Sequence, residues 1–386
     1  MFKIVLILSL SVMGSKAFAD NNDFKMVQRI IDSVSQKYAP DKRTALFDVN
    51  VTDDSGQIVM KGKTNLPKAK QEVMDSLSKL KIAYTDSVLV LPELSMGEKT
   101  WALATLSVSN IRSGPDHAAE LVSQALMGTP VKVLESVDGW VHIQTPDLYI
   151  GWVDEMGISM KTEAEMTLWK HSKRCFFNQI AGRAVAAPKR NASSVSDLVL
   201  GDLFESVSEV KNYLQIKFPD GRMAYVKKTD CLPYEDWIVQ KPNVDAVLSI
   251  AKQMLGNPYM WGGTSCKAVD CSGMTKIAWY TQGVILARDA SQQARYGEHI
   301  DFKEIANLQK GDLLFFGRNA QHIIHVGMYL GKGLYIHASG LVRINSIDPN
   351  DPLYNMTERK HLVAATRILN SVNSEGIVGV KEQGWY

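Results

Sequence analysis

Cys271, His325 and His337, all in the last third of the chain, are residue types that cysteine hydrolases combine. Cys271 follows an aromatic and glycine-rich stretch at 258–263 and begins a segment with the pattern of a helix, so its thiol is expected on the first turn of that helix. Unpaired backbone N–H groups and the positive end of the helix dipole favour a thiolate at such a position. A thiolate, an imidazole and a third polar group are the parts that nucleophilic catalysis needs.

The two histidines lie on predicted strands that flank a Gly-Lys-Gly turn at 331–333. A turn centred on residue 331 or 332 puts His325 and His337 on one face of the hairpin, directly or diagonally opposed, whereas a turn centred between two residues puts them on opposite faces. On a shared face, His325 can accept the thiol proton while His337 holds its ring and fixes its tautomer. Taken singly, each of the three residues is better explained by packing than by catalysis, but the combination favours catalysis.

The other cysteines leave alternatives open. Cys175 and Cys231 bracket one predicted domain and either form a disulfide or remain thiols. Cys266 lies shortly before Cys271 and is either a resolving thiol or a packed loop residue. The sequence contains no Cys-x-x-Cys pair, so no zinc site is expected, and neither a metal nor an organic cofactor is implied.

Residues 1–19 carry the pattern of a signal peptide, with Lys3 before an apolar run at 4–13 and Ala-Phe-Ala at 17–19. The apolar run is too short to span a bilayer and no later run is long enough, so we expect an exported protein, periplasmic or secreted, without a membrane span. Cleavage would leave equal numbers of basic and acidic side chains, a balance that offers no electrostatic footprint for nucleic acid or anionic lipid.

The segment at 20–98 has the pattern of an α+β module. Apolar spacing predicts a helix over 24–38, a β-hairpin around the turn at 53–56, a second helix from Pro67 to about Leu80, and a strand at 84–91. This order loosely resembles a BON-like module. We assign no chemistry to the segment.

Between 99 and 238 the chain repeats itself at a constant offset. Gly128 matches Gly201, Trp140 matches Tyr213, and the Pro-Asp pair at 146–147 matches the pair at 219–220. A constant offset over this length indicates duplication of one unit, which sets boundaries at 99–163 and 164–238. Each unit is rich in β-forming residues and broken by turns, a pattern that predicts two small barrels.

The segment at 239–386 is α+β in order, with helices before strands. Helices are expected at 244–255, from Cys271 to about residue 282, and at 291–296. The expected strands then follow at 312–316, 323–330, 333–338, 342–347 and 363–368.

Four motifs in this last segment together resemble the NlpC-type cell-wall cysteine peptidases. They are Tyr259-Met260-Trp261-Gly262-Gly263, Asp270-Cys271-Ser272-Gly273, His325-Val326-Gly327-Met328-Tyr329 and Tyr335-Ile336-His337-Ala338. The resemblance covers about residues 243–370, and the two repeated units resemble the bacterial SH3 domains of such hydrolases. It implies an α+β multidomain protein in which the N-terminal module and two SH3-like barrels precede a papain-like catalytic domain of helices and an antiparallel sheet.

The resemblance also implies roles for the residues at the site. Cys271 is the nucleophile, His325 the base and His337 the orienting third member. The hydroxyl of Tyr259 would steady the thiolate or the oxyanion, or its ring would only pack against the glycine turn. Further expected substrate contacts are Trp261, Asp270, Ser272 and Asp289. Relatives often carry Ser after that last Asp, where this chain has Ala290.

Members of the family hydrolyse the bond between γ-D-glutamate and a diamino acid in murein stem peptides. In a subset with SH3-like domains, an acidic residue of the first barrel receives a free L-alanine amine. Glu120 matches that residue and Tyr149 matches the aromatic wall beside it, although Glu120 is equally explained as a solvated carboxylate.

The predicted function is therefore that of a γ-D-glutamyl-L-diamino acid endopeptidase acting on murein peptides with a free N-terminus. Three alternatives stay open: a remodelling hydrolase of intact, crosslinked peptidoglycan, a related amidase or acyltransferase, and a wall-binding protein with vestigial catalysis. The preferred diamino acid and the oligomeric state are left undetermined by the sequence.

Overall fold

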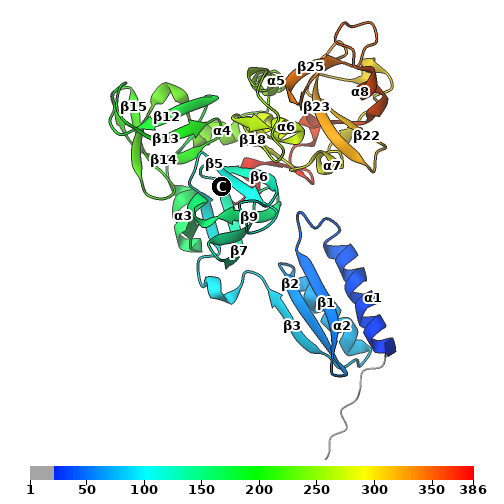
Figure 1. Ribbon diagram of the computed structural model, residues 1–386. Coiled ribbons are helices and arrows are strands. Elements are labelled where there is room, and N and C mark those ends of the chain that lie inside the picture. The colour runs from blue at the N-terminus through cyan, green and yellow to red at the C-terminus, as the bar shows by residue number, and fades with distance from the viewer. Residues whose placement is uncertain (1–20) are drawn as a thin grey trace, which may run out of the picture. The chain divides into compact units, whose positions relative to one another are not determined.

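The computed structural model describes residues 21–386, and the expected signal peptide at residues 1–19 lies outside them. Within the described residues, no helix is both long enough and apolar enough to cross a membrane. The chain divides after Leu91 into two compact units, which are described one at a time (Figure 1). The second unit carries all the residues with predicted chemistry.

The first unit is a three-stranded sheet with two helices. Its elements are α1 (Asn21–Tyr38), β1 (Phe47–Asp54), β2 (Gln57–Thr64), α2 (Pro67–Lys79) and β3 (Thr85–Val90). β1 and β2 form an antiparallel hairpin, and β3 pairs in parallel with β2. Val27 and Ile31 of α1 share a core with Val49 and Val51 of β1, which are spaced as a helix face and a strand face require. This order of elements agrees with the sequence pattern.

The second unit begins with a seven-stranded antiparallel sheet, here called the first sheet. Its strands are β4 (Trp101–Ala104), β5 (Val108–Arg112), β6 (Leu121–Leu126), β7 (Pro130–Val137), β8 (Trp140–Gln144), β9 (Ile150–Asp154) and β10 (Ile158–Lys161). They lie in the order β6-β5-β9-β8-β7-β4-β10, and the outer strands do not pair among the described strands. The described strands of this sheet therefore do not form a closed barrel. The edge strand β6 packs against the last segment of the chain instead of closing on β10.

The second sheet repeats the first. Its strands are β11 (Arg174–Phe177), β12 (Ala181–Val185), β13 (Ser194–Val199), β14 (Leu203–Val210), β15 (Tyr213–Lys217), β16 (Met223–Lys227) and β17 (Cys231–Pro233). Their order, β13-β12-β16-β15-β14-β11-β17, equals that of the first sheet strand for strand. This agreement supports a duplication. The sheet is likewise open, and Cys175 and Cys231 on its adjacent strands β11 and β17 are free thiols.

Short helices connect these parts. α3 (Glu163–His171) joins the two sheets and begins with a capping box between Thr162 and Glu165, and α4 (Tyr234–Val239) follows the second sheet. Single 3-10 turns lie at Leu94–Met96, Glu155–Gly157, Lys228–Asp230, Ile305–Asn307 and Leu369–Ser371.

The last segment is a six-stranded antiparallel sheet packed against helices. Its strand order is β21-β26-β22-β23-β24-β25. The helices are α5 (Val244–Gln253), α6 (Cys271–Tyr280), α7 (Ala290–Gln293), α8 (Met356–His361) and α9 (Val380–Gln383). The strands of the sheet are β21 (Glu298–His299), β22 (Leu313–Gly317), β23 (Ile323–Gly331), β24 (Leu334–Ser339), β25 (Leu341–Ser346) and β26 (Leu362–Arg367). Two small ribbons add β18 (Thr264–Ser265) with β19 (Ala268–Val269), and β20 (Val284–Leu286) with β27 (Ile377–Gly379).

The two sheets and the last segment share one apolar core. Buried residues of the first sheet (Leu126), the second sheet (Leu203) and the last segment (Trp279) belong to the same cluster. Gly128 shows how close the two sheets come, because its backbone has a φ of +75° and an added Cβ would lie 2.3 Å from the carbonyl oxygen of Leu203. The continuous core holds the sheets against the segment that carries the candidate site.

Candidate active site

Cys271 is the first residue of α6, as the sequence predicts, and its thiol is free. Asp270 is the N-cap residue, since its Oδ1 accepts a hydrogen bond from the backbone N–H of Gly273 at 2.7 Å. This contact starts the helix at the cysteine. α6 is buried and packs against β23, the strand that carries His325. The candidate nucleophile and the candidate base therefore lie on adjoining elements.

The Cys271 thiol is buried. Burial and the nearby Asp270 carboxylate raise its pKa to about 12. A backbone hydrogen bond from Val326, the positive charge of Arg288 and a backbone hydrogen bond from Ser272 act in the opposite direction without cancelling the effect of burial. The resting site therefore holds a neutral thiol, and the thiolate expected at the helix start is not the resting form. Attack by sulfur requires an acceptor for its proton.

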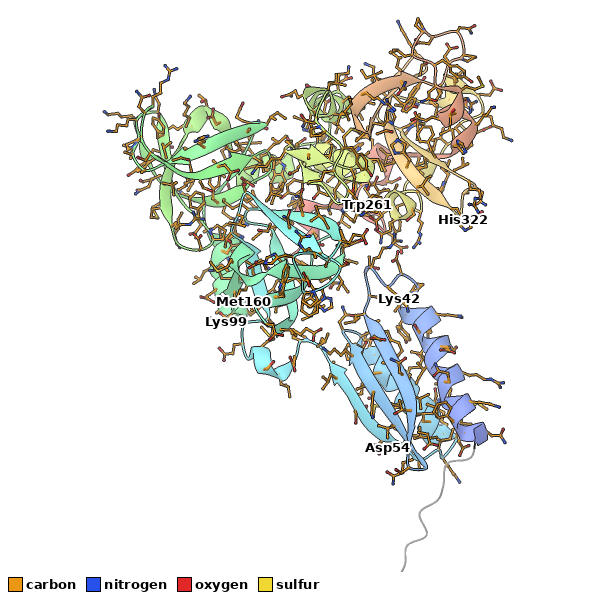
Figure 2. The ribbon with its side chains drawn as sticks, in the orientation of Figure 1. Lys42, Asp54, Lys99, Met160, Trp261 and His322 are labelled. Atoms are coloured by element: carbon orange, nitrogen blue, oxygen red, sulfur yellow. The ribbon has the colours of Figure 1, made fainter. Side chains whose placement is uncertain are left out.

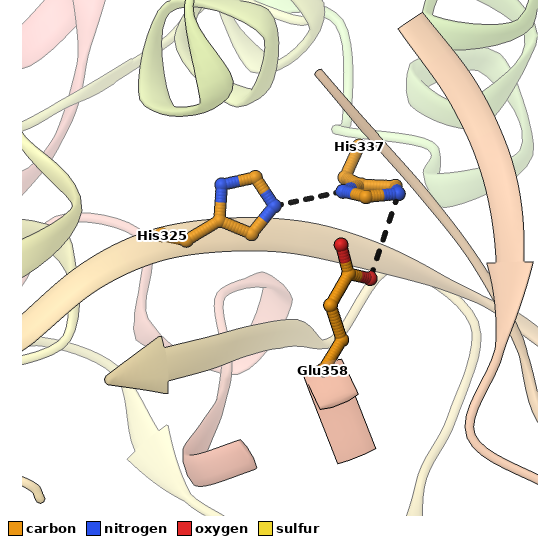
Figure 3. Close-up of side chains that lie close together, drawn as sticks. All are labelled: His325, His337 and Glu358. Atoms are coloured by element: carbon orange, nitrogen blue, oxygen red, sulfur yellow. Dashed lines mark hydrogen bonds and ion pairs between the residues drawn. The ribbon is translucent and has the colours of Figure 1, made fainter. Parts of the chain in front are cut away.

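The two histidines form a hydrogen-bonded pair. His325 Nε2 lies 2.7 Å from His337 Nδ1, and Figure 3 shows the other ring nitrogen of His325 turned away from His337. Across the hairpin Gly327 pairs with His337, so His325, two residues before Gly327, lies diagonally opposite His337 on the same face. The predicted shared face is confirmed.

Asn345, which the sequence analysis missed, fixes the tautomer of the pair. Its Oδ1 lies 2.9 Å from His337 Nε2, while its Nδ2 donates to the carbonyl of Leu353 at 3.2 Å, which settles the orientation of the amide. His337 Nε2 therefore carries a proton and its Nδ1 accepts one from His325 Nε2. The remaining nitrogen of His325, Nδ1, is left unprotonated and can accept the thiol proton.

Both imidazoles are neutral at neutral pH. Burial lowers the pKa of His325 to about 3, with further lowering by His337 and Arg343. Burial also lowers the pKa of His337, against the opposing charge of Glu358. The resting site is thus a neutral thiol with a neutral acceptor, and charge separates only as the reaction proceeds.

Glu358 of α8 adds a carboxylate behind the pair. Its Oε2 lies 3.8 Å from His337 Nε2 and accepts a hydrogen bond from the Tyr335 hydroxyl. Among the described residues, His325, His337 and Glu358 form a group whose ligand atoms lie within 4.8 Å of one another, a spacing that could hold a metal (Figure 3). Both nitrogens of His337 already take part in hydrogen bonds to His325 and Asn345, so we assign no metal to this group.

Asp270 is predicted to contact the substrate, but both oxygens of its carboxylate accept hydrogen bonds from other residues of the protein. Arg288, only 1% exposed, donates from Nη2 to Asp270 Oδ2 at 2.6 Å and from Nη1 to Oδ1 at 3.2 Å, and Gly262 N–H also donates to Oδ2. Ser272 donates to Asp270 Oδ1 and accepts from Arg288 Nη1 at 3.0 Å. The Asp270–Arg288 pair therefore joins the glycine turn to the start of α6.

The predicted contact Asp289 is half-buried and caps α7 in a reciprocal box with Gln292. Tyr259 is half-buried, and burial is the first cause that raises the pKa of its hydroxyl, with further raising by Cys271 and Asp270. That hydroxyl is therefore a neutral hydrogen-bond donor at the pH of the reaction.

The first sheet meets the last segment at Glu120. Trp261 Nε1 donates to Glu120 Oε1 at 2.7 Å, and both side chains are exposed (Figure 2 labels the Trp). Beside them, Thr264 N–H donates to the side-chain oxygen of Gln124 on β6 at 2.9 Å. Gly262 has a φ of +78°, and an added Cβ would lie 2.3 Å from the Leu121 carbonyl oxygen. The contact places a carboxylate of the first sheet beside the motif that precedes the nucleophile.

Tyr149, the predicted aromatic wall, is buried with 7% of its surface exposed. It lies close enough to Arg288 for its charge to be among the causes that raise the pKa of that guanidinium, although burial is the first influence and acts the other way. The buried side chain of Tyr149 therefore lies within electrostatic reach of the Arg288 guanidinium.

Comparisons with protein families match two parts of the chain. A family described as NlpC/P60 family matches residues 256–367, which include Cys271, His325 and His337. A family described as bacterial dipeptidyl-peptidase Sh3 domain matches residues 111–158, within the first sheet.

Individual proteins extend the likeness over both parts. "Dipeptidyl-peptidase 6" of Lysinibacillus sphaericus is 30% identical over 265 residues, which cover 66% of this chain and 94% of the relative. "Gamma-D-glutamyl-L-lysine dipeptidyl-peptidase" of Bacillus cereus is 31% identical over 253 residues, 62% of this chain and 73% of the relative.

Two solved structures share the fold. An NlpC/P60 family protein from Bacillus cereus superposes with a TM-score of 0.60 at 24% identity, over 69% of this chain and 99% of its own. An NlpC/P60 endopeptidase from Photobacterium damselae subsp. piscicida has a TM-score of 0.54 at 15% identity, over 90% of this chain and 91% of its own.

Proposed function

The chain belongs to the NlpC/P60 family, and we propose that it is a cysteine peptidase that hydrolyses the bond between γ-D-glutamate and a diamino acid in murein stem peptides. The observation that carries the proposal is the hydrogen-bonded relay from His325 through His337 to Asn345, whose first member lies on a strand packed against the helix that Cys271 begins. The substrate class is supported by the relative named for γ-D-glutamyl-L-lysine.

In the proposed acylation step, the Cys271 proton passes to His325 Nδ1 as the sulfur attacks the γ-carbonyl carbon. Because burial opposes the free thiolate, proton transfer and carbon–sulfur bond formation proceed together. The oxyanion that forms is stabilised by the backbone N–H of Cys271 at the start of α6 and by the Tyr259 hydroxyl.

The tetrahedral intermediate then collapses. The carbon–nitrogen bond breaks and the diamino acid amine takes the proton held by His325, which leaves a thioester on Cys271. Water, deprotonated by the same imidazole, attacks the thioester and releases the γ-D-glutamyl product with the free thiol. Throughout the cycle, His337 and Asn345 hold the His325 ring in the tautomer that each proton transfer requires.

We further propose that Glu120 receives the ammonium group of an N-terminal L-alanine and that Tyr149 forms the wall beside it. The Trp261 hydrogen bond occupies one Glu120 oxygen and orients the carboxylate while leaving its charge available. Trp261, Asp270, Ser272 and Asp289 complete the proposed substrate contacts.

We place the activity outside the cytoplasm, periplasmic or secreted, because residues 1–19 carry an export pattern and murein is the proposed substrate. The second sheet is proposed to be an SH3-like domain with a spacer role, on the strength of its shared strand order with the first.

Mass spectrometry of defined peptides tests the function. L-Ala-γ-D-Glu-diamino acid peptides should be cut at the γ-glutamyl bond, and Cys271→Ala should lose activity by at least about a thousandfold while retaining the fold. An N-acetyl cap should prevent cleavage. Equal cleavage of capped and free peptides would remove the Glu120 assignment, and loss of turbidity of purified sacculi would favour a remodelling hydrolase. Binding to sacculi without cleavage of any peptide would favour a wall-binding protein.

A further inference from the structure

A carboxylate lies at the far end of the imidazole relay, where the sequence analysis expected none. Glu358, on α8, has its side chain 18% exposed, and it holds one oxygen against the Tyr335 hydroxyl. The same oxygen lies 3.8 Å from His337 Nε2 (Figure 3). α8 begins at a dedicated cap, because Asn355 Oδ1 accepts from Glu358 N–H at 3.1 Å. The cap and the tyrosine together fix where this carboxylate lies.

We propose that Glu358 is a positioning residue of the reaction, which acts through His337 to stabilise the positive charge that His325 acquires when it takes the Cys271 proton. The inference rests on the proposed cysteine peptidase function. Glu358 does not touch the substrate in this proposal, and the proton is never transferred to it.

The positive charge that forms on His325 is shared along the hydrogen bonds of the relay. When His325 becomes an imidazolium, its Nε2–H strengthens the hydrogen bond to His337 Nδ1, and partial positive charge spreads to the His337 Nε2–H. That N–H points to the neutral Asn345 oxygen at 2.9 Å, which fixes direction but supplies no charge. Glu358 supplies the negative charge at the same end of the ring. In a site screened from water, an interaction over this distance retains much of its strength.

An opposing charge makes the role of Glu358 necessary. Arg343 on β25 lies directly across from His337 in the strand register and contributes to lowering the pKa of both histidines. The titratable and charged groups that face His337 are therefore His325 from β23, Tyr335 from its own strand, Arg343 from β25 and Glu358 from α8. Glu358 is the anionic member of this set, so its removal leaves the developing imidazolium beside an unopposed cation.

A purely structural role for Glu358 makes different predictions. If the carboxylate only docks α8 through Tyr335, then Glu358→Gln should lower thermal stability and leave the chemistry of folded protein unchanged. If it stabilises the imidazolium, the chemistry should change while the isosteric amide keeps the Tyr335 contact and the fold.

The test measures alkylation of Cys271 by iodoacetamide across pH, read by mass spectrometry of the Cys271 peptide, for wild type, Glu358→Gln, Glu358→Asp and Arg343→Gln. Alkylation needs the proton to leave the sulfur but needs no murein peptide, so this result is independent of whether the proposed substrate is right. Parallel peptide cleavage gives kcat and KM. Thermal unfolding identifies any variant that is not folded.

Glu358→Gln should lower the plateau alkylation rate and kcat by about tenfold with KM unchanged, because the lost charge is felt only when His325 is protonated. The acid limb of the alkylation rate plotted against pH should move to lower pH in this variant, because a histidine pair without the carboxylate is harder to protonate. Arg343→Gln should do the reverse in both respects, and Glu358→Asp, which keeps the charge, should restore most of the rate. Unchanged alkylation in folded Glu358→Gln, or equal losses in the Gln and Asp variants, would overturn the proposal. Should the Gln variant not fold, a wild-type rate in Arg343→Gln together with a full loss in Glu358→Asp would overturn it as well.

Discussion

The two repeated sheets have the same strand order but meet the last segment differently. The first sheet presents Gln124 and Glu120 to the motif before the nucleophile, through hydrogen bonds with Thr264 and Trp261. The second sheet meets the same segment through an ion pair between Asp197 and Lys267. Of the two, the first sheet supplies the side chains proposed to bind substrate.

The clearest difference lies at one repeated position, the Asp of the Pro-Asp pair. Asp147 of the first sheet is 2% exposed at its side chain and pairs with Lys276 of α6 at 2.8 Å. Its counterpart Asp220 is 29% exposed and pairs with Arg222, its near neighbour in the chain, at 2.6 Å. The Asp of this turn therefore joins the first sheet to the catalytic helix, whereas in the second sheet the Asp pairs within its own turn.

This difference shows what a duplication preserves. Backbone order follows from the strand pattern, which both copies keep, whereas burial and charge partners follow from what each copy packs against. A residue's role in one sheet is thus no guide to its role in the other. Paired substitutions at matched positions can test each step of this comparison.

The largest expected effect is at Asp147. Asp147→Asn leaves Lys276 largely buried without its charge partner and should lower the free energy of unfolding by about 3 kcal/mol. Asp220→Asn removes a surface pair and should cost at most about 0.5 kcal/mol. Urea unfolding of both variants measures the difference, and similar losses would contradict the contrast between the two sheets.

The Asp147 effect should also depend on pH. Burial opposes ionisation of Asp147, but Lys276 outweighs it, so the pKa of the folded carboxyl is lowered. A carboxyl with a lowered folded pKa stabilises the protein above its unfolded pKa, about 4, and loses that contribution as the pH falls through the folded value. The stability gap between wild type and Asp147→Asn should therefore narrow below about pH 4. A gap that widens on acidification would contradict the pairing.

The second effect concerns the contact between the first sheet and the glycine motif. Gly262→Ala combines a left-handed backbone with a Cβ 2.3 Å from the Leu121 carbonyl oxygen, so we expect a loss of about 2 kcal/mol and a fall in kcat/KM as the sheet is pushed away. Gly221→Ala is the matched control in the second sheet, with a φ of +89° and open space around the added Cβ. It should cost about 1 kcal/mol and leave activity unchanged. Equal activity losses would show that strain alone, and not the contact, is responsible.

Local patterns predicted much of the last segment. Each of the five expected strands agrees with the structure to within one residue at both ends, and the helix begins at Cys271 as predicted. The shared face of His325 and His337 followed from turn spacing because a hairpin register is a local property. The same logic predicted the duplication, since a constant offset needs no knowledge of packing.

Contacts between residues that are far apart in the sequence could not be predicted from such local patterns. Asn345 and Glu358 reach His337 from β25 and α8, and nothing in their own spacing marks them, although a further register step from β24 to β25 would have brought Asn345 to the relay face. The open edge of the first sheet and the neutral thiol of Cys271 depend on what buries them. The spacing of residues along one segment does not reveal which distant elements will bury that segment, so these two properties could not be predicted from the sequence pattern.

The smallest expected effect is at Glu120, where the carboxylate is exposed and partly shielded by water. Glu120→Gln keeps an acceptor for Trp261 but removes the charge proposed to bind the substrate ammonium, so KM for free-amine peptides should rise about tenfold with kcat unchanged. Glu209→Gln, an exposed carboxylate of the second sheet paired with Lys228, is the matched control and should alter neither constant. Steady-state cleavage of one peptide by both variants measures the difference. A rise in KM of similar size in each would show that general surface charge, and not Glu120 in particular, is responsible. A fall in kcat without a change in KM would move Glu120 from substrate binding to support of Trp261.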